Sequence, residues 1–395
     1  MRFDPQRLRG ELEALESRHE RRRRRMVEAI PDLAHNARVR LDGRELLNFC
    51  SNDYLGLRTH PALIEAAGRS LQRDGLGAGA AHLVSGHCLE HHALESELAA
   101  FTGRERALLF SSGYMANLGV VGALCARHDL VLADRLNHAS LLDAARLAGA
   151  RLRRYTHLDA LAARRALEQH PGTALIVTDG LFSMDGDVAP LRELATLAQQ
   201  YGAGLMVDDA HGLGVLGASG RGSLEDGGVD ARSVPILIGT LGKALGTFGA
   251  FVAGEATLID TLIQRARTYI YTTALPPSIA AATRAALRLV QREPWRRERL
   301  SALVGRFRAG ATRYALPLMA TSSPIQPLLV GDSARALALS AALEQQGYWV
   351  SAIRPPTVPR GSARLRVTLS AAHSDADVDG LLEALATVFA QRSAA

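Results

Sequence analysis

Short apolar runs alternate with helical patterns along the chain from about residue 46 onward. Within each run the apolar residues are continuous and do not alternate with polar ones, which is typical of strands buried on both faces. Strands of this kind, separated by helices, predict an α/β domain with a mostly parallel sheet. The runs that we assign to this sheet are Ala107–Phe110, Leu130–Ala133, Ala174–Thr178, Gly204–Val207 and Pro235–Ile238.

The N-terminal segment has a helical period. Leu8, Leu12 and Leu15 fall on one face, and Pro31 stops the pattern, so we predict an amphipathic helix over residues 1–30. This helix forms most of an N-terminal helical segment that we place at residues 1–45.

A different pattern marks the C-terminal part of the chain. After Pro276–Pro277 a long stretch rich in Ala, Leu and Arg predicts a helix. Strands separated by helices are expected further on, at Ile325–Val330, Trp349–Ile353 and Leu365–Leu369. We therefore expect a large domain over residues 46–284 and a smaller α+β domain over residues 285–395.

Polar residues gather at the ends of the runs in the large domain. In open α/β sheets the ligand crevice lies at the carboxyl ends of the strands, so these clusters predict a single site. The clusters are Ser111–Gly113, Asp134–His138, Asp179–Ser183, Asp208–His211 and Thr240–Lys243.

The composition is that of an ordinary globular chain. Of the 395 residues, 47% are hydrophobic and 22% charged, and no stretch approaches the roughly 20 apolar residues of a bilayer span. The three cysteines are odd in number and widely spaced, so no disulfide framework is expected. Acidic residues interrupt the arginine-rich start, unlike in a mitochondrial transit peptide. We expect a cytoplasmic protein.

One lysine, Lys243, stands among 46 Lys and Arg residues. Arginine cannot replace lysine where a neutral amine must attack a carbonyl, because guanidinium stays protonated. Upstream, Asp208 ends a buried run, where a carboxylate needs a partner such as a protonated pyridine nitrogen. The alternatives are a surface lysine on a loop and an aspartate that caps a helix or forms a structural ion pair.

Three further motifs have competing interpretations. The segment Gly212–Gly217 matches the dinucleotide fingerprint, but a loop follows it where a helix is required. Ser111–Asn117 precedes a helix, so its backbone N–H groups either bind a phosphate or form an ordinary N-cap. In His87–His92 two histidines lie one helical turn apart, but no second ligand pair accompanies them, so no metal site is predicted.

Ordered blocks over most of the chain carry a resemblance to a known family. They run from Asn48–Leu57 to Arg364–Leu369 and include Leu83–Gly86, Asp134–Ser140, Phe182–Asp187, Val207–Gly212 and Thr240–Lys243. Together they resemble the α-oxoamine synthases, which are fold-type I enzymes that depend on pyridoxal 5'-phosphate (PLP). The resemblance implies a large domain with a mostly parallel sheet, a smaller C-terminal domain and a homodimer.

The segment Ile353–Pro359 is similar to the corresponding segment in one branch of this family. The enzymes of that branch are acyltransferases of biotin biosynthesis. They condense L-alanine with a pimeloyl thioester of carrier protein or CoA and release CO2. The resemblance therefore implies this reaction in a homodimer, with either an acyl carrier protein or CoA carrying the acyl group.

The resemblance assigns roles around the cofactor to matching positions. Lys243 matches the Schiff-base lysine, and Asp208 matches the acid that pairs with the pyridine nitrogen. His211 and Ser183 match groups near the phenolic oxygen, and His138 matches the histidine that stacks on the ring beside the substrate. The implied catalytic residues are thus Lys243, His138 and Asp208.

Four further positions match cofactor contacts of the family. Gly113 and Tyr114 match the loop at the cofactor, and Thr240 matches a phosphate ligand. Thr273 resembles a phosphate contact that the second subunit of a dimer provides.

Substrate contacts are implied as well. Thr357 matches one of them, and an N-terminal arginine is another, for which we take Arg23 from the run Arg21–Arg25. For the substrate carboxylate, which suits a bidentate arginine, Arg354 and Arg366 are candidates and we favour Arg366. The arginine run itself is either a solvated helix face or a docking patch for an acidic carrier protein or CoA phosphates.

The sequence departs from the family pattern at two positions. Asp179 stands where the family usually has glutamate. His82 follows a glycine-rich loop where the family often has serine or glycine, so acyl-chain contacts do not carry over there.

Two other functions compete with this interpretation. Another α-oxoamine synthase would use glycine or serine with a different acyl thioester. A nucleic-acid-binding protein would account for the pI of about 9.6, but the basic residues are spread over the chain and no aromatic-interleaved patch is present. We therefore expect neither nucleic acid nor membrane as a partner.

Overall fold

The computed structural model describes residues 4–30, 37–170 and 172–390. These residues form two compact units. Unit 1 lies within residues 1–54, 184–186 and 298–395, and unit 2 within residues 55–183 and 187–297. This grouping places the N-terminal residues in the same unit as the C-terminal part of the chain.

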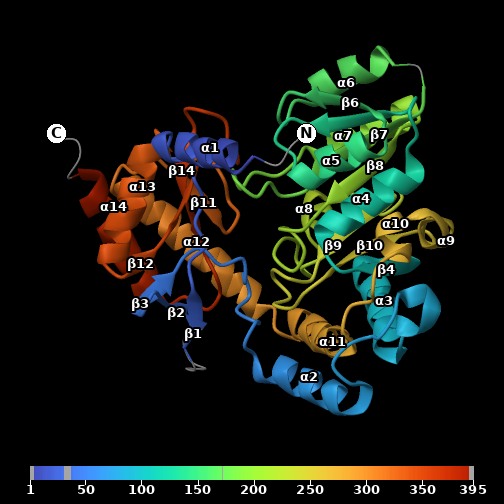
Figure 1. Cartoon of the computed structure of the whole chain (residues 1–395), viewed down its shortest axis with the longest axis horizontal. Coiled ribbons are helices and arrows are strands. Elements are labelled where there is room, and N and C mark those ends of the chain that lie inside the picture. The colour runs from blue at the N-terminus through green and yellow to red at the C-terminus, as the bar shows by residue number, and fades with distance from the viewer. Residues whose placement is uncertain (1–3, 31–36, 171, 391–395) are drawn as a thin grey trace. The chain divides into compact units, whose positions relative to one another are not determined.

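Unit 2 contains a seven-stranded sheet among its described residues, in the order β4-β10-β9-β8-β7-β5-β6 (Figure 1). The pairs from β9 through β8, β7 and β5 to β6 are parallel, and β10 is antiparallel to both of its neighbours. The sheet is therefore mostly parallel, as the apolar runs predict. Its strands are β4 Arg106–Phe110, β5 Leu130–Asp134, β6 Arg151–Tyr155, β7 Ala174–Asp179, β8 Gly204–Asp208, β9 Ile236–Thr240 and β10 Ala250–Gly254.

Both faces of this sheet are buried, which explains why its strands are continuously apolar. On β5, Val131 packs into one hydrophobic core and Leu132 into the other, because successive side chains point to opposite faces. The first core is completed by α4, α5 and α9, and the second by α6 and α7. These helices are α4 Gly113–Leu124, α5 Ala139–Leu147, α6 Ala160–Glu168, α7 Leu191–Tyr201 and α9 Ala256–Arg265.

Of the remaining helices of unit 2, α10 adds Tyr269 to the first core and α8 adds Leu224 to the second. The predicted helix after Pro276 is present as α11, which packs against α2 and α3. These elements are α2 Pro61–Asp74, the π-helix η1 His82–Gly86, α3 Leu89–Thr102, α8 Ser223–Gly227, α10 Arg267–Ile270 and α11 Pro277–Arg292.

Unit 1 combines two small sheets with helices, which fits the predicted α+β pattern of the C-terminal part. One sheet has the order β1-β2-β3-β12 and the other β11-β14-β13. The strands are β1 Val27–Ala29, β2 Arg38–Leu41, β3 Arg44–Asn48, β11 Ile325–Gly331, β12 Tyr348–Trp349, β13 Ser351–Ile353 and β14 Ala363–Thr368. The helices are α1 Pro5–Ser17, α12 Trp295–Arg313, α13 Ser333–Gln345 and α14 Asp375–Ala390, of which α12 begins in unit 2.

The prediction of one helix over residues 1–30 is wrong in its second half. Helix α1 ends at Ser17, and His19 has a φ of 56°, which is incompatible with continuing a right-handed helix. Val27–Ala29 then pairs with β2 as an antiparallel strand. The apolar period continued only to Leu15, and five successive arginines would repel each other on one helix.

Within the described residues, no helix is both long enough and apolar enough to cross a membrane.

Candidate active site

The parallel strands of unit 2 end in polar residues at one edge of the sheet, because their carboxyl ends point the same way (Figure 1). Asp134, Asp179 and Asp208 end β5, β7 and β8, and all three are buried. Thr240 ends β9 and is half-buried. The structure thus brings together the clusters from which the sequence predicts a single site.

Lys243 lies in a tight loop directly after β9. The loop is closed by hydrogen bonds from the Leu241 amide to the Gly249 carbonyl at 2.9 Å and from the Gly246 amide to the Lys243 carbonyl at 2.9 Å. Gly246 has a φ of 66°, and a Cβ there would lie 2.6 Å from the backbone nitrogen of Arg58. This glycine is therefore required for the loop that presents the half-buried lysine.

The Asp208 carboxylate is held in a fixed direction. Its Oδ2 accepts a hydrogen bond from Asn117 Nδ2 at 2.7 Å, and its Oδ1 accepts one from the Ala210 amide at 3.1 Å. Asn117 comes from α4, is fully buried and also donates to Ser140 Oγ at 2.8 Å. No sequence pattern pointed to this role of Asn117 beyond its place in the first turns of the helix after Ser111–Gly113.

His138 is connected to the same network. Ser140 Oγ lies 2.7 Å from His138 Nδ1, and the Ser140 amide donates to that nitrogen at 3.3 Å, so the ring proton of neutral His138 sits on Nε2. Desolvation lowers the pKa of His138; the Lys243 charge lowers it further, while the Asp208 charge opposes both. His138 is therefore a neutral imidazole at pH 7.

Asp179, the position at which the family usually has glutamate, positions His138 through the backbone. Its Oδ2 accepts a hydrogen bond from the His138 amide at 2.7 Å. Burial and then repulsion from Asp208 raise the pKa of Asp179, while the His138 amide and the Lys243 charge oppose this. Lys243 and Asp208 thus act electrostatically on both Asp179 and His138.

The N-terminus of α4 provides backbone N–H groups beside this edge of the sheet. Ser112 is the N-cap and its Oγ accepts the Met115 amide at 3.3 Å. No atom lies within 4 Å of the point where a Cβ on Gly113 would be, so an anion has room to approach the backbone there. The Tyr114 side chain is turned outward and donates to Asp143 Oδ2 at 2.5 Å.

The other predicted cofactor residues also belong to unit 2. His211 is buried in the turn after Asp208, and Ser183 is half-buried in the loop after β7. Thr240 Oγ1 donates to the Gly249 carbonyl at 3.1 Å. Thr273 is exposed in the loop between α10 and α11.

These residues fit PLP by the chemistry of the groups that they offer. A buried and oriented carboxylate, Asp208, suits a protonated pyridine nitrogen. The open N-terminus of α4 at Gly113 suits a phosphate, and Lys243 offers the amine that a carbonyl cofactor requires.

Two of the predicted substrate residues, Arg23 and Thr357, lie in unit 1 around a hollow of about 270 Å³, whereas His138 belongs to unit 2. Thr357 is exposed there, and its Oγ1 accepts a hydrogen bond from Arg22 Nη2 at 3.0 Å. Arg23 also lines the hollow but pairs with Glu16 at 3.1 Å. Of the two arginines, Arg22 is therefore the one in contact with Thr357.

The C-terminal arginines differ in their surroundings. Arg354 lines the same hollow and donates to the His19 carbonyl. Arg364 is buried and forms an ion pair with Asp185. Arg366 is buried on β14, and its Nη2 donates to the uncharged Asn52 Oδ1 at 3.2 Å.

Within the run Arg21–Arg25, three arginines form ion pairs inside unit 1. Arg21 and Arg23 pair with Glu16 at 3.3 and 3.1 Å. Arg25 pairs with Asp42 at 2.7 Å and with Glu344 at 2.5 Å. These contacts favour the interpretation of a solvated face, on which acids of the same unit neutralise part of the run.

Comparisons with known proteins agree with this geometry. The family model for aminotransferase class I and II matches residues 44–385. An 8-amino-7-oxononanoate synthase from Methylococcus capsulatus is 61% identical over 394 residues, which cover 100% of both chains. A crystal structure of 8-amino-7-oxononanoate synthase from Francisella tularensis is 32% identical, with a TM-score of 0.78 over 88% of this chain and 99% of that one. Serine palmitoyltransferase from S. paucimobilis, with a bound PLP–myriocin aldimine, is 27% identical, with a TM-score of 0.92 over 98% of each chain.

The fold and the family match define a PLP-dependent enzyme of the aminotransferase class I and II family. Within it, the chain belongs to the 8-amino-7-oxononanoate synthases, which are acyltransferases of biotin biosynthesis. The resemblance to an α-oxoamine synthase of the biotin branch is thereby confirmed, as is PLP as the cofactor.

Proposed function

We propose that the enzyme condenses L-alanine with a pimeloyl thioester and releases CO2 to form 8-amino-7-oxononanoate. One observation carries the proposal: the buried Asp208, oriented by Asn117, ends β8, and the loop with Lys243 follows the neighbouring parallel strand β9 at the same edge of the sheet. When bound, PLP supplies an electron sink that takes up the electron pair left at Cα of the amino acid.

Lys243 and Asp208 have complementary roles in this proposal. Lys243 holds the cofactor through Nζ and, once its amine is free, removes the Cα proton of alanine. Asp208 favours the protonated pyridine nitrogen, because a nearby anion stabilises the charged form. The Asn117 hydrogen bond keeps this carboxylate pointed in one direction.

His138 stacks on the cofactor ring as a neutral imidazole. Its ring is fixed by Ser140 on one side and its backbone by Asp179. Since Nδ1 accepts from Ser140, the Nε2–H remains as the donor toward the substrate.

The remaining cofactor contacts are assigned to the residues that match cofactor contacts of the family. Gly113 and Tyr114 contribute backbone N–H groups to the phosphate, and Thr240 contributes its hydroxyl. Ser183 and His211 contact the phenolic oxygen.

In unit 1, the hollow beside Thr357 receives the acyl substrate in this proposal. Arg22 contacts Thr357 directly, and Arg354 lines the same hollow, so the far carboxylate of a pimeloyl chain meets two cations there. The amino-acid carboxylate is assigned to Arg366 on β14, because Arg354, the other candidate, lines the hollow that receives the acyl chain.

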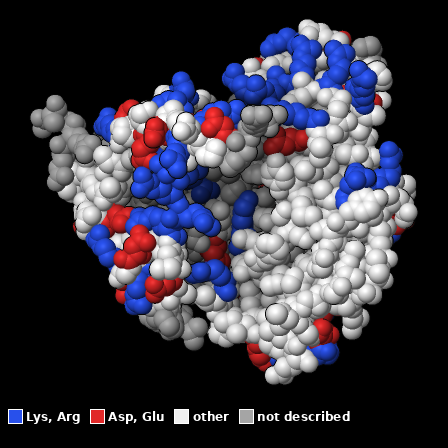
Figure 2. All heavy atoms as spheres, in the orientation of Figure 1, with Lys and Arg blue, Asp and Glu red and all other residues white. Residues whose placement is uncertain are grey.

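The enzyme acts as a homodimer in this proposal. Large apolar side chains of unit 2 are exposed, and contiguous apolar surface in a protein commonly marks an interface. In the view of Figure 2, much of the middle of unit 2 shows uncharged residues, while basic side chains gather over β6 and α6. Thr273 lies in the same loop as the exposed Tyr271, and in this proposal it contacts the phosphate of the PLP bound by the partner subunit. The exposed apolar residues are Leu76, Leu83, Val84, Leu89, Phe248 and Tyr271.

The first test follows the single lysine. Borohydride reduction of the yellow wild-type protein, followed by peptide mapping, should place the pyridoxyl label on Lys243. Lys243→Arg should fold, take no label and lose activity by about 10²–10⁴-fold, because arginine serves neither as imine partner nor as base. Arg265→Lys adds a second, exposed lysine on α9 as a control, and the label should stay on Lys243. Normal turnover in Lys243→Arg, or a label elsewhere, would overturn the assignment.

Substrate choice is tested by initial rates with alanine, glycine and serine, each paired with pimeloyl thioester of CoA or of carrier protein. Alanine should give the highest kcat/KM. A preference for glycine or serine would instead favour another α-oxoamine synthase.

A third test concerns Asn117. In Asn117→Leu the Asp208 carboxylate loses a hydrogen bond worth about 1.5–3 kcal/mol, so PLP affinity should fall by roughly 10–100-fold. Ser140→Ala removes the other hydrogen-bond partner of the Asn117 side-chain amide and should lower the PLP affinity less than Asn117→Leu does. Equal PLP affinity in Asn117→Leu and wild type, measured by the visible absorption of the bound cofactor, would remove Asn117 from the site.

Carrier docking is a further part of the proposal. If an acidic carrier protein docks on the Arg21–Arg25 run, the KM for the carrier-bound substrate rises steeply with salt, whereas the KM for the CoA thioester rises less. We place the enzyme in the cytoplasm, which suits three cysteines that are free thiols.

A further inference from the structure

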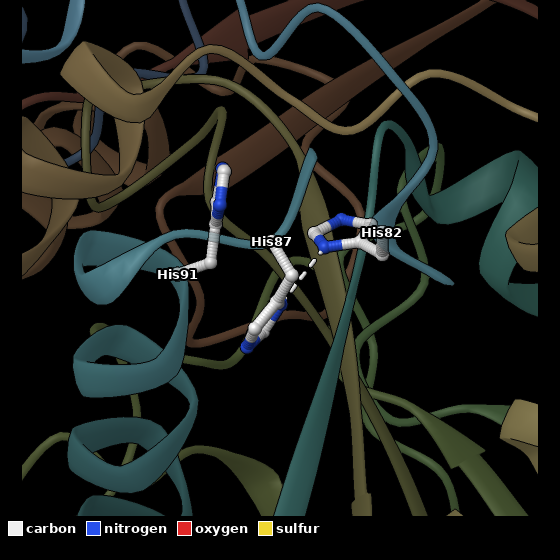
Figure 3. A group of neighbouring side chains, drawn as sticks. All are labelled: His82, His87 and His91. Carbon is white, nitrogen blue, oxygen red and sulfur yellow. Dashed lines mark hydrogen bonds between the residues drawn. The ribbon is translucent and has the colours of Figure 1, made fainter. Parts of the chain in front are cut away.

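Three histidines of unit 2, none of which takes part in the proposed active site, lie together where η1 meets α3. His82 begins η1, His87 follows it, and His91 lies in the first turn of α3 (Figure 3). One ring nitrogen from each lies within 4.8 Å of those of the other two. The sequence showed only the spacing of His87 and His91, and the π-helix adds His82 to them.

The closest pair already has nearly the separation that a metal imposes. His82 Nδ1 and His87 Nδ1 face each other at 3.0 Å. Two nitrogens bound to one tetrahedral zinc ion at 2.0–2.1 Å would lie about 3.3 Å apart. A metal ion would widen this contact by a few tenths of an ångström and replace the proton that the two nitrogens share.

His91 is held in the manner of a metal ligand. Its Nε2 lies 2.7 Å from the Leu275 carbonyl and donates its proton to it. Metal-bound histidines usually give their second ring N–H to such an acceptor, which orients the ring. The basic nitrogen is then Nδ1, which accepts the Cys88 amide at 3.1 Å. A metal bond would replace the contacts of this nitrogen with the Cys88 amide and thiol.

The protonation state also suits a cation. Burial lowers the pKa of His82 to about 3 and also lowers the pKa of His91, and partial desolvation lowers the pKa of the exposed His87. All three rings are therefore neutral near pH 7 and have a lone pair to offer. Nearby, Glu95 Oε2 lies 4.0 Å from His87 Nε2.

We propose that His82, His87 and His91 bind one divalent transition-metal ion of the zinc class, with water as the fourth ligand. Imidazole nitrogen suits Zn²⁺, Ni²⁺ and Cu²⁺ more than Mg²⁺ or Ca²⁺. The bound ion ties η1 to the first turn of α3. It thereby fixes the segment that exposes Leu83 and Val84.

The test uses the tag-free holoenzyme after chelation and titrates it with ZnCl₂ against a chelating indicator. One Zn²⁺ should bind per chain, and the melting temperature should rise with free zinc, because the ion binds the folded state. His87→Gln is the main variant, since His87 is exposed and its replacement should not affect folding. Loss of one of three ligands should weaken zinc binding by at least about tenfold, and His82→Gln should do the same.

Two matched variants separate this site from adventitious binding. His92→Gln removes an exposed histidine next to His91 and should leave the affinity unchanged. Cys88→Ser removes the nearby thiol, whose Sγ lies 3.3 Å from His91 Nδ1, and should also retain binding. The proposal is overturned if no zinc binds at micromolar concentration, or if His82→Gln and His87→Gln bind it as tightly as the parent. Loss of binding in Cys88→Ser would equally overturn the three-histidine set. None of these readouts requires catalytic activity.

Discussion

His157 forms a double ion pair that ties together two loops at the carboxyl edge of the sheet. Its Nδ1 lies 2.9 Å from Asp134 Oδ1, and its Nε2 lies 2.9 Å from Asp187 Oδ2. Asp134 is fully buried at the end of β5, and Asp187 closes the loop that contains Ser183. The imidazolium therefore neutralises two carboxylates and fixes the loop that we assign to the cofactor.

The energy of this contact can be estimated from the structure. Burial alone would lower the pKa of His157, but the hydrogen bonds to Asp134 and Asp187 outweigh it and raise the pKa from 6.5 to about 10. At 1.36 kcal/mol per pKa unit this difference corresponds to ~5 kcal/mol as an upper limit. Breaking a buried ion pair by removal of one partner costs about 3–5 kcal/mol. We expect His157→Gln to destabilise the protein by about 3–5 kcal/mol.

The pH dependence has a defined direction. Because the folded pKa is above the unfolded one, the stabilisation is fully present below about pH 6.5 and is lost as the pH rises toward 10. Urea unfolding of wild type and His157→Gln at pH 7 and pH 10 should thus show a large difference in the free energy of unfolding at pH 7 and a small one at pH 10. His128→Gln, at an exposed position of unit 2, serves as the control.

Two results would refute this reasoning. The first is a loss of less than about 1 kcal/mol in His157→Gln at pH 7, which is the range of an exposed pair. The second is a difference between the two proteins that does not shrink between pH 7 and pH 10, since His157 would then not be the titrating group.

Three other predictions concern packing in a strand, glycine in a helix and a second buried ion pair. In Gly239→Ala, on β9, the new Cβ would meet the ring of Phe251 at 2.4 Å, so urea unfolding should show a loss of about 1–3 kcal/mol. Gly305→Ala in α12 has open space and should stabilise by about 0.5–1 kcal/mol; destabilisation there would contradict the helix assignment. Arg364→Met leaves buried Asp185 without its ion-pair partner and should cost about 3–5 kcal/mol, which the double variant with Asp185→Leu should largely recover. If the double variant is no more stable than Arg364→Met, the uncompensated charge is not the cause.

In the seven-stranded sheet, the strands that the sequence predicted are largely buried on both faces. β5 and β7 are fully buried, so their apolar runs identify them without a partner. β6 was not assigned because it is an edge strand whose sequence, Arg-Leu-Arg-Arg-Tyr, is mostly exposed. β10 runs antiparallel to both neighbours, an arrangement that depends on pairing and not on its own residues.

For the site, residue types with a single chemical use were predictable. Lys243 and Asp208 could be chosen because an amine and a buried carboxylate are required by the implied chemistry. Asn117, Asp179 and Arg22 could not, because their roles depend on which atom they reach. A neutral amide on a helix has no signal of its own until the fold places it 2.7 Å from Asp208.

The sequence by itself determined the α/β class, the single lysine at the end of a strand and the family to which the ordered blocks belong. These follow from local pattern and from residue chemistry, which the chain contains before it folds. The tertiary structure decided which side chains meet: Asn117 with Asp208, His157 between two aspartates, and His82 beside His87 and His91. Such contacts join residues brought together by the sheet register and by one turn of π-helix, and neither can be deduced from the spacing of residues along the chain.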